Sequence, residues 1–426
     1  MSNTKHIYFD YAATTPIDPL VLEEMNAVYK TIYGNSESVH KIGVKAHEKL
    51  QNARKKIADI LDVNEKEIIF TSGGTESNNI AIQGVVRHFL HNKNNDDNNN
   101  NNAKSRMPHI ITSVIEHSAV LNTCKYLEEE GVKVSYIEVD QNGVIKLDQL
   151  KNAITDDTIL ISVMHANNEI GTLQPIAEIG QIAHNNNILF HTDAVQSFGK
   201  IRLDLHELEI DMLSASAHKI YGPKGVGLLF LKNCGRKTSI DKSEESLKKE
   251  NRKWDFYLDP LMHGGGHEFN WRPSTLNVPG IAGFAKAVEL MDTRREEEMG
   301  RLKRFQKDII SWAEKNIAGV KLNGHPVNRL VNNINLSIKN IPGNELLLGL
   351  DLDGFAISTG SACSADSGEV SHVIRALNME PEYAQGTVRI TVGRFTTEQE
   401  VEELKKGLKK VITALRVIKE QRKQEK

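Results

Sequence analysis

The stretch that decides the fold is TILISVMHANNEIGTLQPIAEIGQIAHNNNILFHTD, residues 158–193. Two apolar runs, Thr158–Met164 and Ile188–His191, each have the length of one buried strand, and Ile176–Asn185 between them has apolar residues at helical spacing. A strand, a helix and a second strand in this order form the repeating unit of a parallel sheet.

The same alternation continues on both sides of this stretch. We predict four more strands and two more helices: strands at Glu67–Phe70, His109–Ser113, Asp211–Ser214 and Val226–Leu231, and helices at Glu76–Phe89 and Ala119–Glu130. This pattern predicts an α/β fold with a mainly parallel, doubly wound sheet that is covered on both faces.

Further helices precede this alternation, and a different pattern follows it. Asp18-Pro19 is typical of an N-cap followed by proline at the first helical position, and Leu22, Met25 and Tyr29 fit the spacing of one helix face. A long helix at Ile281–Asn316 and later strands predict a second, smaller α+β domain. Those strands are expected at Asn333–Ile338 and Thr387–Thr391, before a last helix that Thr396-Thr397 can cap.

Composition narrows the function classes. The chain has 426 residues, 39% of them hydrophobic, and a net charge of −3, which argues against nucleic acid or an anionic membrane as the main partner. No apolar run approaches the roughly 18 residues of a membrane span, and residues 1–5 show no signal or presequence pattern. Three cysteines without a C-x-x-C pair form neither a disulfide framework nor a zinc ribbon. We therefore expect a cytoplasmic protein in a reducing compartment, with no metal site.

Two segments have the composition of insertions. Asn92–Asn102 contains only asparagine, aspartate and one lysine, so we expect a disordered loop insertion over residues 92–103. Residues 235–253 are dense in charge and poor in apolar side chains, and we expect a solvated surface insertion there.

Polar residues follow each predicted strand, where ligands gather in open parallel sheets. Thr71-Ser72-Gly73-Gly74-Thr75 leads into a helix whose first N–H groups can hold a phosphate, although Gly-Gly turns alone are common. His117 and the run Asn167-Asn168-Glu169 follow two other strands, although a lone histidine is more often a surface or core residue.

An acid and a lysine complete the set. Asp193 comes directly after a buried strand, where a carboxylate is costly unless it is paired, and a protonated pyridine nitrogen is one good partner. Lys219 lies at another strand exit, and burial there would lower its pKa and make it a nucleophile toward an aldehyde. An anion cradle, a stacking ring, an acid and a nucleophilic lysine together predict pyridoxal 5′-phosphate as the cofactor.

Cys363 differs from the other two cysteines. It lies among small and polar residues, in Ser361-Ala362-Cys363-Ser364, and we interpret it as a reactive thiol. Cys124 lies on an amphipathic helix and Cys234 at a strand end, positions that favour inert residues.

These motifs resemble those of the NifS/IscS-like cysteine desulfurases of the class V aminotransferase family. The resemblance runs from Tyr8-Phe9-Asp10 to Gly393-Arg394-Phe395, and includes His218-Lys219-Ile220-Tyr221-Gly222 and Gly360-Ser361-Ala362-Cys363. It implies the fold type I of pyridoxal-phosphate enzymes with a seven-stranded sheet, in a large domain over residues 15–292. The small domain would combine residues 1–14 with residues 293–426.

The resemblance also implies a role for each matching residue. Lys219 would bind the cofactor covalently, His117 would stack on its ring, and Cys363 would accept the sulfur. The other cofactor contacts would come from Gly74, Thr75, Asn168, Asp193, Gln196, Ser216 and His218, with Thr275 reaching the phosphate of the neighbouring subunit in a homodimer. Arg389, with Asn168, would hold the substrate carboxylate.

By the same resemblance, the reaction would convert L-cysteine into L-alanine and a persulfide on Cys363. Sulfur would then pass to an iron–sulfur scaffold protein or another acceptor. One departure concerns Ser274, where the family usually has glycine before the threonine at 275. An aminotransferase, a selenocysteine lyase and a non-catalytic scaffold that binds partners through its insertions are the alternatives.

Overall fold

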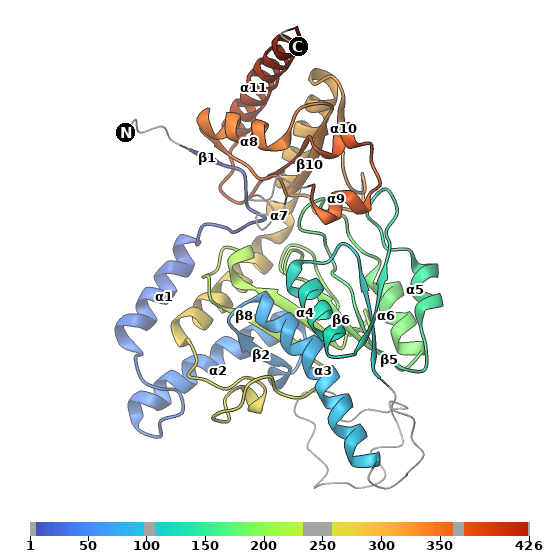
Figure 1. Ribbon diagram of the computed structural model, residues 1–426. Coiled ribbons are helices and arrows are strands. Elements are labelled where there is room, and N and C mark those ends of the chain that lie inside the picture. Colours follow the sequence, from blue (N-terminus) through green and yellow to red (C-terminus); the bar gives the residue numbers. More distant parts are fainter. Residues whose placement is uncertain (1–5, 98–106, 233–257, 361–369, 425–426) are drawn as a thin grey trace.

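The computed structural model describes residues 6–97, 107–232, 258–360 and 370–424. A large sheet with helices on both faces lies beside a smaller group of strands and helices, which includes both ends of the described chain (Figure 1). Among the described residues, no helix is long and apolar enough to cross a membrane.

Seven strands form the large sheet, in the order β2-β8-β7-β6-β5-β3-β4. Their bounds are Ile68–Thr71 (β2), His109–Ser113 (β3), Lys133–Ile137 (β4), Thr158–Ser162 (β5), Leu189–Asp193 (β6), Met212–Ser216 (β7) and Gly227–Leu231 (β8). Neighbouring strands from β4 to β7 are parallel, and only β8 is antiparallel to its neighbours β2 and β7. The predicted mainly parallel sheet is confirmed, whereas β4 was not predicted.

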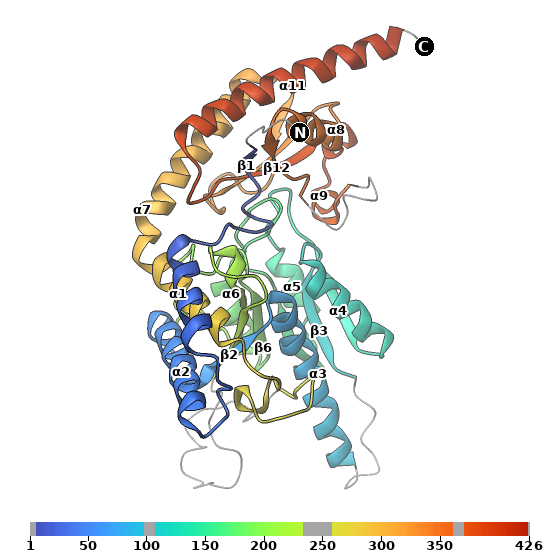
Figure 2. The same ribbon diagram turned by 90° about the vertical axis from the view of Figure 1, so that its left-hand side faces the viewer.

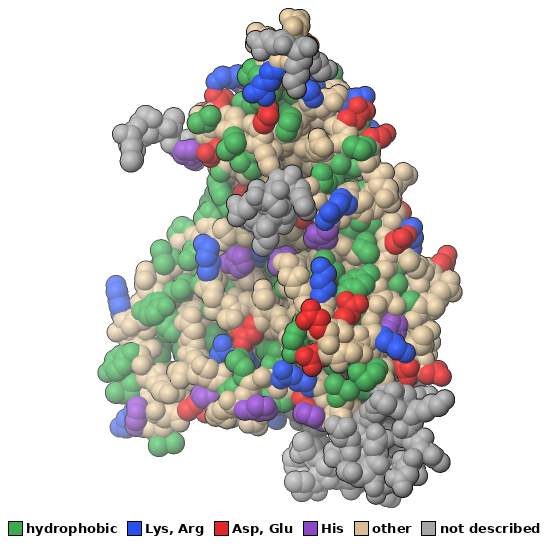
Figure 3. Space-filling model, in the orientation of Figure 1, with side chains coloured by type: hydrophobic (Ala, Val, Ile, Leu, Met, Phe, Trp, Pro, Cys, Tyr) green, Lys and Arg blue, Asp and Glu red, His purple; other side chains and the backbone are tan. Residues whose placement is uncertain are grey.

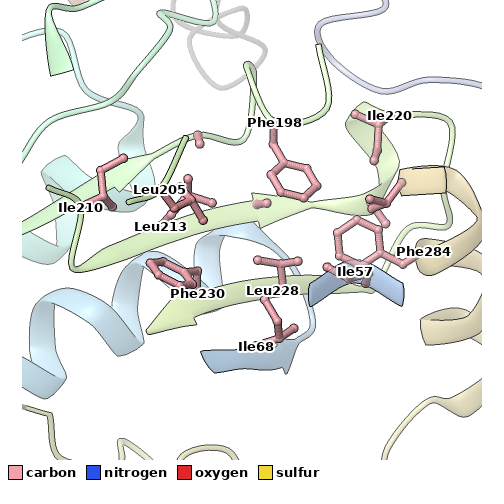
Figure 4. Packing of buried hydrophobic residues seen from close by; sticks show 14 of the residues in the cluster. Ile57, Ile68, Phe198, Leu205, Ile210, Leu213, Ile220, Leu228, Phe230 and Phe284 are labelled. Atoms are coloured by element: carbon pink, nitrogen blue, oxygen red, sulfur yellow. The ribbon is translucent and has the colours of Figure 1, made fainter. Parts of the chain in front are cut away.

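Helices cover the sheet on both faces. On one face, buried residues of α2 (Lys41–Leu61), α6 (Ile176–Asn185) and α7 (Val278–Asn316) pack on alternate strand residues, such as Phe190 and Leu213. Figure 4 shows part of this core, with Ile57 and Phe284 facing Leu228. On the other face, α3 (Gly74–Asp97) and α4 (Ser118–Glu129) pack on the remaining strand residues. The short helix α5 (Leu147–Ala153) completes this part.

Two predicted helices differ from those in the structure. Asp18 caps α1 (Pro19–Thr31) as predicted, because its side chain accepts a hydrogen bond from the Leu20 N–H. The buried face of α1, however, consists of Val21, Met25 and Val28, while Leu22 is 46% and Tyr29 58% exposed. The predicted helix is therefore confirmed, and Met25 lies on its buried face, whereas Leu22 and Tyr29 do not, because helix spacing alone is compatible with more than one face.

Helix α3 continues to Asp97, beyond its predicted end at Phe89 and into the asparagine-rich stretch. Extending an existing helix fixes one residue per hydrogen bond gained, so unfavourable asparagine propensities of under about 1 kcal/mol each can be tolerated. The rest of that stretch, residues 98–102, and the charged segment 235–253 lie outside the described residues.

The smaller group is built around a second core. Strands β9 (Val320–Leu322), β10 (Asn333–Ile338) and β12 (Thr387–Thr391) form an antiparallel sheet, and β1 (Ile7–Tyr8) pairs with β11 (Phe355–Ala356). Helices α8 (Gly343–Leu352), α9 (His372–Ala376), α10 (Pro381–Ala384) and α11 (Glu398–Gln424) complete it. Helix α7 contributes to both cores and runs along both parts (Figure 2). The division at residues 14/15 and 292/293 stays a prediction.

A strained segment precedes α7. Glu268, Phe269, Asn270 and Ser274 all have positive φ, with 105° at Ser274, a region that side chains with a Cβ rarely adopt. A buried ion pair with Arg54 holds Glu268, whose carboxylate also accepts a hydrogen bond from the Phe70 N–H. Ser274 thus stands at a position where the backbone conformation favours glycine, the residue that is usual there in the family that the sequence resembles.

Replacing Ser274 by glycine is expected to raise the free energy of unfolding by about 1 kcal/mol, because glycine adopts positive φ without strain. Urea unfolding followed by circular dichroism measures the change. Exposed Ser311 in α7 is the control, since Ser311→Gly should lower stability by roughly 0.5 kcal/mol. An equal loss of stability in both variants would contradict the strain at Ser274.

Candidate active site

A cavity of about 300 Å³ lies at the carboxyl ends of β6 and β7, beside the first turns of α3 and α4. The structure brings together at its wall most of the residues predicted for the site: Gly74, Thr75, His117, Asn168, Asp193, Gln196, Ser216, His218, Lys219 and Arg389. Figure 3 shows histidine side chains on this face at the junction between the two parts of the molecule.

Two predicted residues do not line this cavity. Thr275 lines a separate cavity of about 120 Å³, together with Ser72 and Arg272. Cys363 lies outside the described residues, and Gly360, the last described residue before it, does line the larger cavity.

The first turn of α3 forms one wall. Gly73 has a φ of 156°, and a Cβ on Gly74 would lie 2.5 Å from Cγ2 of Val195. Only glycine at position 74 lets the helix start this close to the chain that follows β6. N–H groups of a first helical turn lack partners within their helix, so this wall suits a phosphate.

Asp193 is the last residue of β6, and two hydrogen-bond donors hold its carboxylate. The side-chain amide of Asn78 donates to Oδ2 at 2.7 Å, and the Val195 N–H donates to Oδ1 at 2.9 Å. These two hydrogen bonds fix the orientation of a carboxylate that is almost fully buried. A cationic ring nitrogen is the partner that would suit this carboxylate best.

Lys219 follows β7 in a short 3₁₀ turn, Ala217–Lys219. Its Nζ donates to the carbonyl oxygens of Ala12 and Ala13, each at 2.6 Å. Burial is the largest cause that lowers the pKa of Lys219 to about 7, and the positive charges of Lys200 and Arg389 contribute to this lowering. A large fraction of this amine is therefore neutral near pH 7 and can attack a carbonyl carbon.

Two histidines flank the lysine as neutral rings. His117 caps α4, where Nδ1 accepts a hydrogen bond from the Ala119 N–H at 3.1 Å, so its ring cannot rotate freely. Burial lowers the pKa of His117, and it lowers that of His218 to about 4. A neutral, fixed ring at position 117 suits stacking on an aromatic cofactor.

Arg389 extends from β12 into the cavity and is almost fully buried. Its guanidinium donates to the carbonyl oxygens of Asn168 and Gly360, at 2.9 and 2.8 Å, and to the Asp10 carboxylate at 2.7 Å. Its Nε is buried without a partner among the described residues. The arrangement leaves donor capacity for a substrate carboxylate.

Unpaired polar atoms test whether pyridoxal phosphate fits this cavity. Oε1 of Gln196 and Oδ1 of Asn78 are buried without a hydrogen-bond partner among the described residues, and both side chains line the cavity. Buried polar atoms are rarely left unpaired in folded proteins. These two oxygens, the N–H groups of the first turn of α3, the Asp193 carboxylate and the Lys219 amine together form a set of donors and acceptors that suits this cofactor.

Sequence reasoning missed several residues of the site. Asn78, Ala12, Ala13 and His372 line the cavity, and Asp10 pairs with Arg389. The N-terminal run containing residues 10–13 belongs to a motif of the family resemblance and follows no predicted strand. Glu116, next to His117, is a further residue that sequence reasoning missed. It is fully buried, which raises its pKa to about 8, and it accepts hydrogen bonds from the Ser113 hydroxyl and the Met164 N–H.

Comparisons with known proteins agree with this geometry. The sequence pattern of the family described as aminotransferase class-V matches residues 7–404. The cysteine desulfurase IscS of Dictyoglomus turgidum is 44% identical over 97% of this chain and 96% of its own length. The mitosomal cysteine desulfurase of Trachipleistophora hominis is 40% identical over 96% of this chain and 87% of its own.

Solved structures give the same result. A NifS-like protein superimposes with a TM-score of 0.83 at 36% identity, over 96% of this chain and all of its own. SspA, solved in complex with cysteine, superimposes with a TM-score of 0.74 at 35% identity, over 92% of this chain and 99% of its own.

The lowered pKa of Lys219 predicts how cofactor capture depends on pH. Below about pH 7 the capture rate of pyridoxal phosphate by cofactor-free protein should rise about tenfold per pH unit, because only the neutral amine reacts. Above that pH the rate should level off. Visible absorbance after rapid mixing measures it, and a rate that still rises steeply beyond pH 9 would contradict the lowered pKa.

Proposed function

This chain belongs to the class V aminotransferase family and is a cysteine desulfurase of its NifS/IscS-like group, and we propose that the cavity around Lys219 is its active site. Members of this family depend on pyridoxal phosphate. The observation that carries the proposal is the buried Lys219 amine, whose pKa is lowered to about 7. It lines the same cavity as the Asp193 carboxylate and the first turn of α3.

The residues of the cavity divide into those that hold the cofactor and those that act on the substrate. Gly74 and Thr75 bind the phosphate, His117 stacks on the ring and Asp193 pairs with the ring nitrogen. Gln196, Asn168, Ser216 and His218 supply the remaining polar contacts, and Lys219 binds the cofactor covalently. When bound, pyridoxal phosphate withdraws electrons from the α-carbon of an attached amino acid.

The substrate in this proposal is L-cysteine. Arg389 binds its carboxylate through the planar guanidinium, and Asn168 lies beside it. The Lys219 amine removes the α-proton and holds it at Nζ. A neutral amine is required for this step, which is consistent with the lowered pKa of Lys219.

Cys363 completes the reaction as a thiolate, because a neutral thiol is a poor nucleophile. Its sulfur attacks the sulfur of the substrate. A sulfur–sulfur bond forms while the carbon–sulfur bond of the substrate breaks, and the electron pair of the broken bond moves to the β-carbon. The β-carbon takes up the proton that the Cys363 thiol lost on forming the thiolate, and Nζ of Lys219 returns the α-proton to the α-carbon. L-Alanine leaves, and a persulfide remains on Cys363 for transfer to an acceptor.

The acceptor in this proposal is an iron–sulfur scaffold protein or another sulfur-accepting protein. A reducing compartment such as the cytoplasm suits this chemistry, because disulfide formation would remove the Cys363 thiolate. An aminotransferase activity would not need Cys363, and a selenocysteine lyase would prefer selenocysteine over cysteine. Assays with both amino acids separate these alternatives.

A homodimer is also part of the proposal. Large apolar side chains are exposed on α1, on the segment that connects it to α2 and at the start of α2, namely Leu20, Leu22, Tyr29, Tyr33, Val39, Ile42 and Val44. Figure 3 shows hydrophobic side chains gathered on this edge of the molecule. Exposed clusters of this kind mark protein interfaces. A second copy is the partner we propose, because Thr275 lines no part of its own active-site cavity and would serve that of the neighbour.

Replacing Cys363 by alanine should leave the visible absorbance of the bound cofactor intact and reduce alanine formation from cysteine by about 100-fold or more. The matched control is Cys124→Ala. Burial raises the pKa of the Cys124 thiol to about 12, so this residue should be inert and turnover should be preserved. Normal turnover in the Cys363 variant would refute the proposed nucleophile.

Replacing both Leu22 and Tyr29 by glutamate should convert the dimer into a monomer, because charges in an apolar interface are costly to desolvate. Light scattering coupled to size-exclusion chromatography measures the mass. Leu352→Glu on α8 is the control, since Leu352 is 88% exposed and lies outside the α1–α2 surface. An unchanged dimer in the double variant would place the interface elsewhere.

A further inference from the structure

The backbone is strained two residues after Lys219. Tyr221 has a φ of 66°, in the left-handed region that residues with a Cβ rarely occupy. Its N–H donates to the Thr15 hydroxyl at 2.8 Å, and its carbonyl accepts from the Asp18 N–H at 3.0 Å. Such strain persists only where the surroundings impose it, and it concentrates at functional sites.

Arg394 holds the side chain of Tyr221 from the other part of the molecule. Its guanidinium lies 4.1 Å from the centroid of the Tyr221 ring, and its backbone N–H donates to the Tyr221 hydroxyl at 2.7 Å. The same guanidinium donates to the Asp18 carboxylate at 2.6 Å and to the Glu298 carboxylate at 2.7 Å. One side chain thus joins the start of α1, the middle of α7 and the chain after Lys219.

This group of charges is buried. The side chains of Arg394, Asp18 and Glu298 are 9%, 4% and 6% exposed. Buried ion pairs contribute little net stability compared with apolar packing, because each charge loses its hydration. Although burial alone would lower the pKa of Arg394, Glu298 and Asp18 raise it. We therefore interpret this cluster as a device that fixes the positions of Arg394 and the Tyr221 ring, more than as a source of stability.

Arg394 also follows closely after the residue proposed to bind the substrate. Arg389 lies within β12 and Arg394 lies in the turn after it. This turn packs tightly on the N-terminal segment, since a Cβ on Gly393 would lie 2.1 Å from the Tyr11 ring. The short, tightly packed turn ties the position of Arg389 to those of Arg394 and the Tyr221 ring.

We propose that Arg394 is a positioning residue that couples the arginine holding the substrate carboxylate to Lys219, through the strained Tyr221. The inference rests on the proposed function of Lys219 and Arg389. Binding of a carboxylate at Arg389 fixes β12, Arg394 then holds Tyr221, and the Lys219 amine stays aligned with the α-proton. Small misplacements of a proton acceptor are enough to slow such a transfer strongly.

The experiment measures the proton transfer by itself. Holoenzyme is incubated with L-alanine in D₂O, and exchange of the α-hydrogen is followed by NMR per cofactor-loaded site. This exchange does not require Cys363, so it remains measurable even if sulfur transfer proceeds by another route. Arg394→Gln should slow the exchange by about tenfold, and Arg394→Lys by less, while the affinity for alanine changes by no more than about twofold.

Arg301→Gln is the matched control. Arg301 donates to the carbonyl oxygens of Gly393, Arg394 and Thr396 in the same turn, and its hydrogen bonds do not involve Tyr221. The rate of α-hydrogen exchange in the Arg301→Gln variant should stay within about twofold of wild type. A second readout is the pH midpoint of the visible absorbance of the holoenzyme, which reports the environment of Lys219 without turnover. It should shift in Arg394→Gln and not in Arg301→Gln.

A purely structural role would lower the thermal stability of Arg394→Gln but leave exchange per loaded site at the wild-type rate. That result, or an equal loss of exchange in Arg301→Gln, would overturn the proposal. If Arg394→Gln does not fold, Tyr221→Phe carries the test, because it removes the hydroxyl that accepts from Arg394 while it keeps the ring. Wild-type exchange in both Tyr221→Phe and Arg394→Lys would then overturn it.

Discussion

Burial of the large sheet on both of its faces is the constraint on which the rest of the structure depends. Helices cover each face, so a polar side chain within a strand needs a partner inside the sheet. His191 shows this, since its ring lies between the hydroxyls of Ser162 and Ser214 on the neighbouring strands. Groups of the large sheet that must meet a ligand can therefore stand only at strand ends: Asp193 is the last residue of β6, while Asn168 and Lys219 follow β5 and β7.

This constraint explains which parts of the fold could be predicted. Buried strands of the large sheet appear in the sequence as short apolar runs, and β3 begins and ends where the sequence indicated. In the smaller sheet, β10 and β12 also match their predicted bounds, and there apolar residues alternate with polar ones. β4 was missed because it lies at the sheet edge, where most of its residues are only partly buried and the apolar signal is weak. The buried face of α1 depends on contacts with α7, which no local pattern contains.

The same contrast between local and long-range signals explains which residues of the site could be predicted. Residues that directly follow a strand were identified, whereas Asn78, Asp10 and Ala12 were not. Asn78 lies one helical turn inside α3, and its importance comes from a hydrogen bond to Asp193, 115 residues away. Asp10 and Ala12 belong to the N-terminal segment, and they reach Arg389 and Lys219 only because that segment pairs with β11 and β12. Such long-range pairing has no local signature in the sequence.

The reactivity of Lys219 depends on the same long-range assembly. Burial is the largest cause of its lowered pKa, ahead of the charges on Lys200 and Arg389. The burial is produced in part by the N-terminal segment, whose Ala12 and Ala13 carbonyls accept from Nζ, and by β12, which carries Arg389 into the cavity. The large sheet alone would present a lysine at a strand end that is open to water, with a pKa near 10.4. A nucleophilic lysine therefore requires both parts of the molecule, which is why the strand-end motif indicates the chemistry but cannot produce it alone.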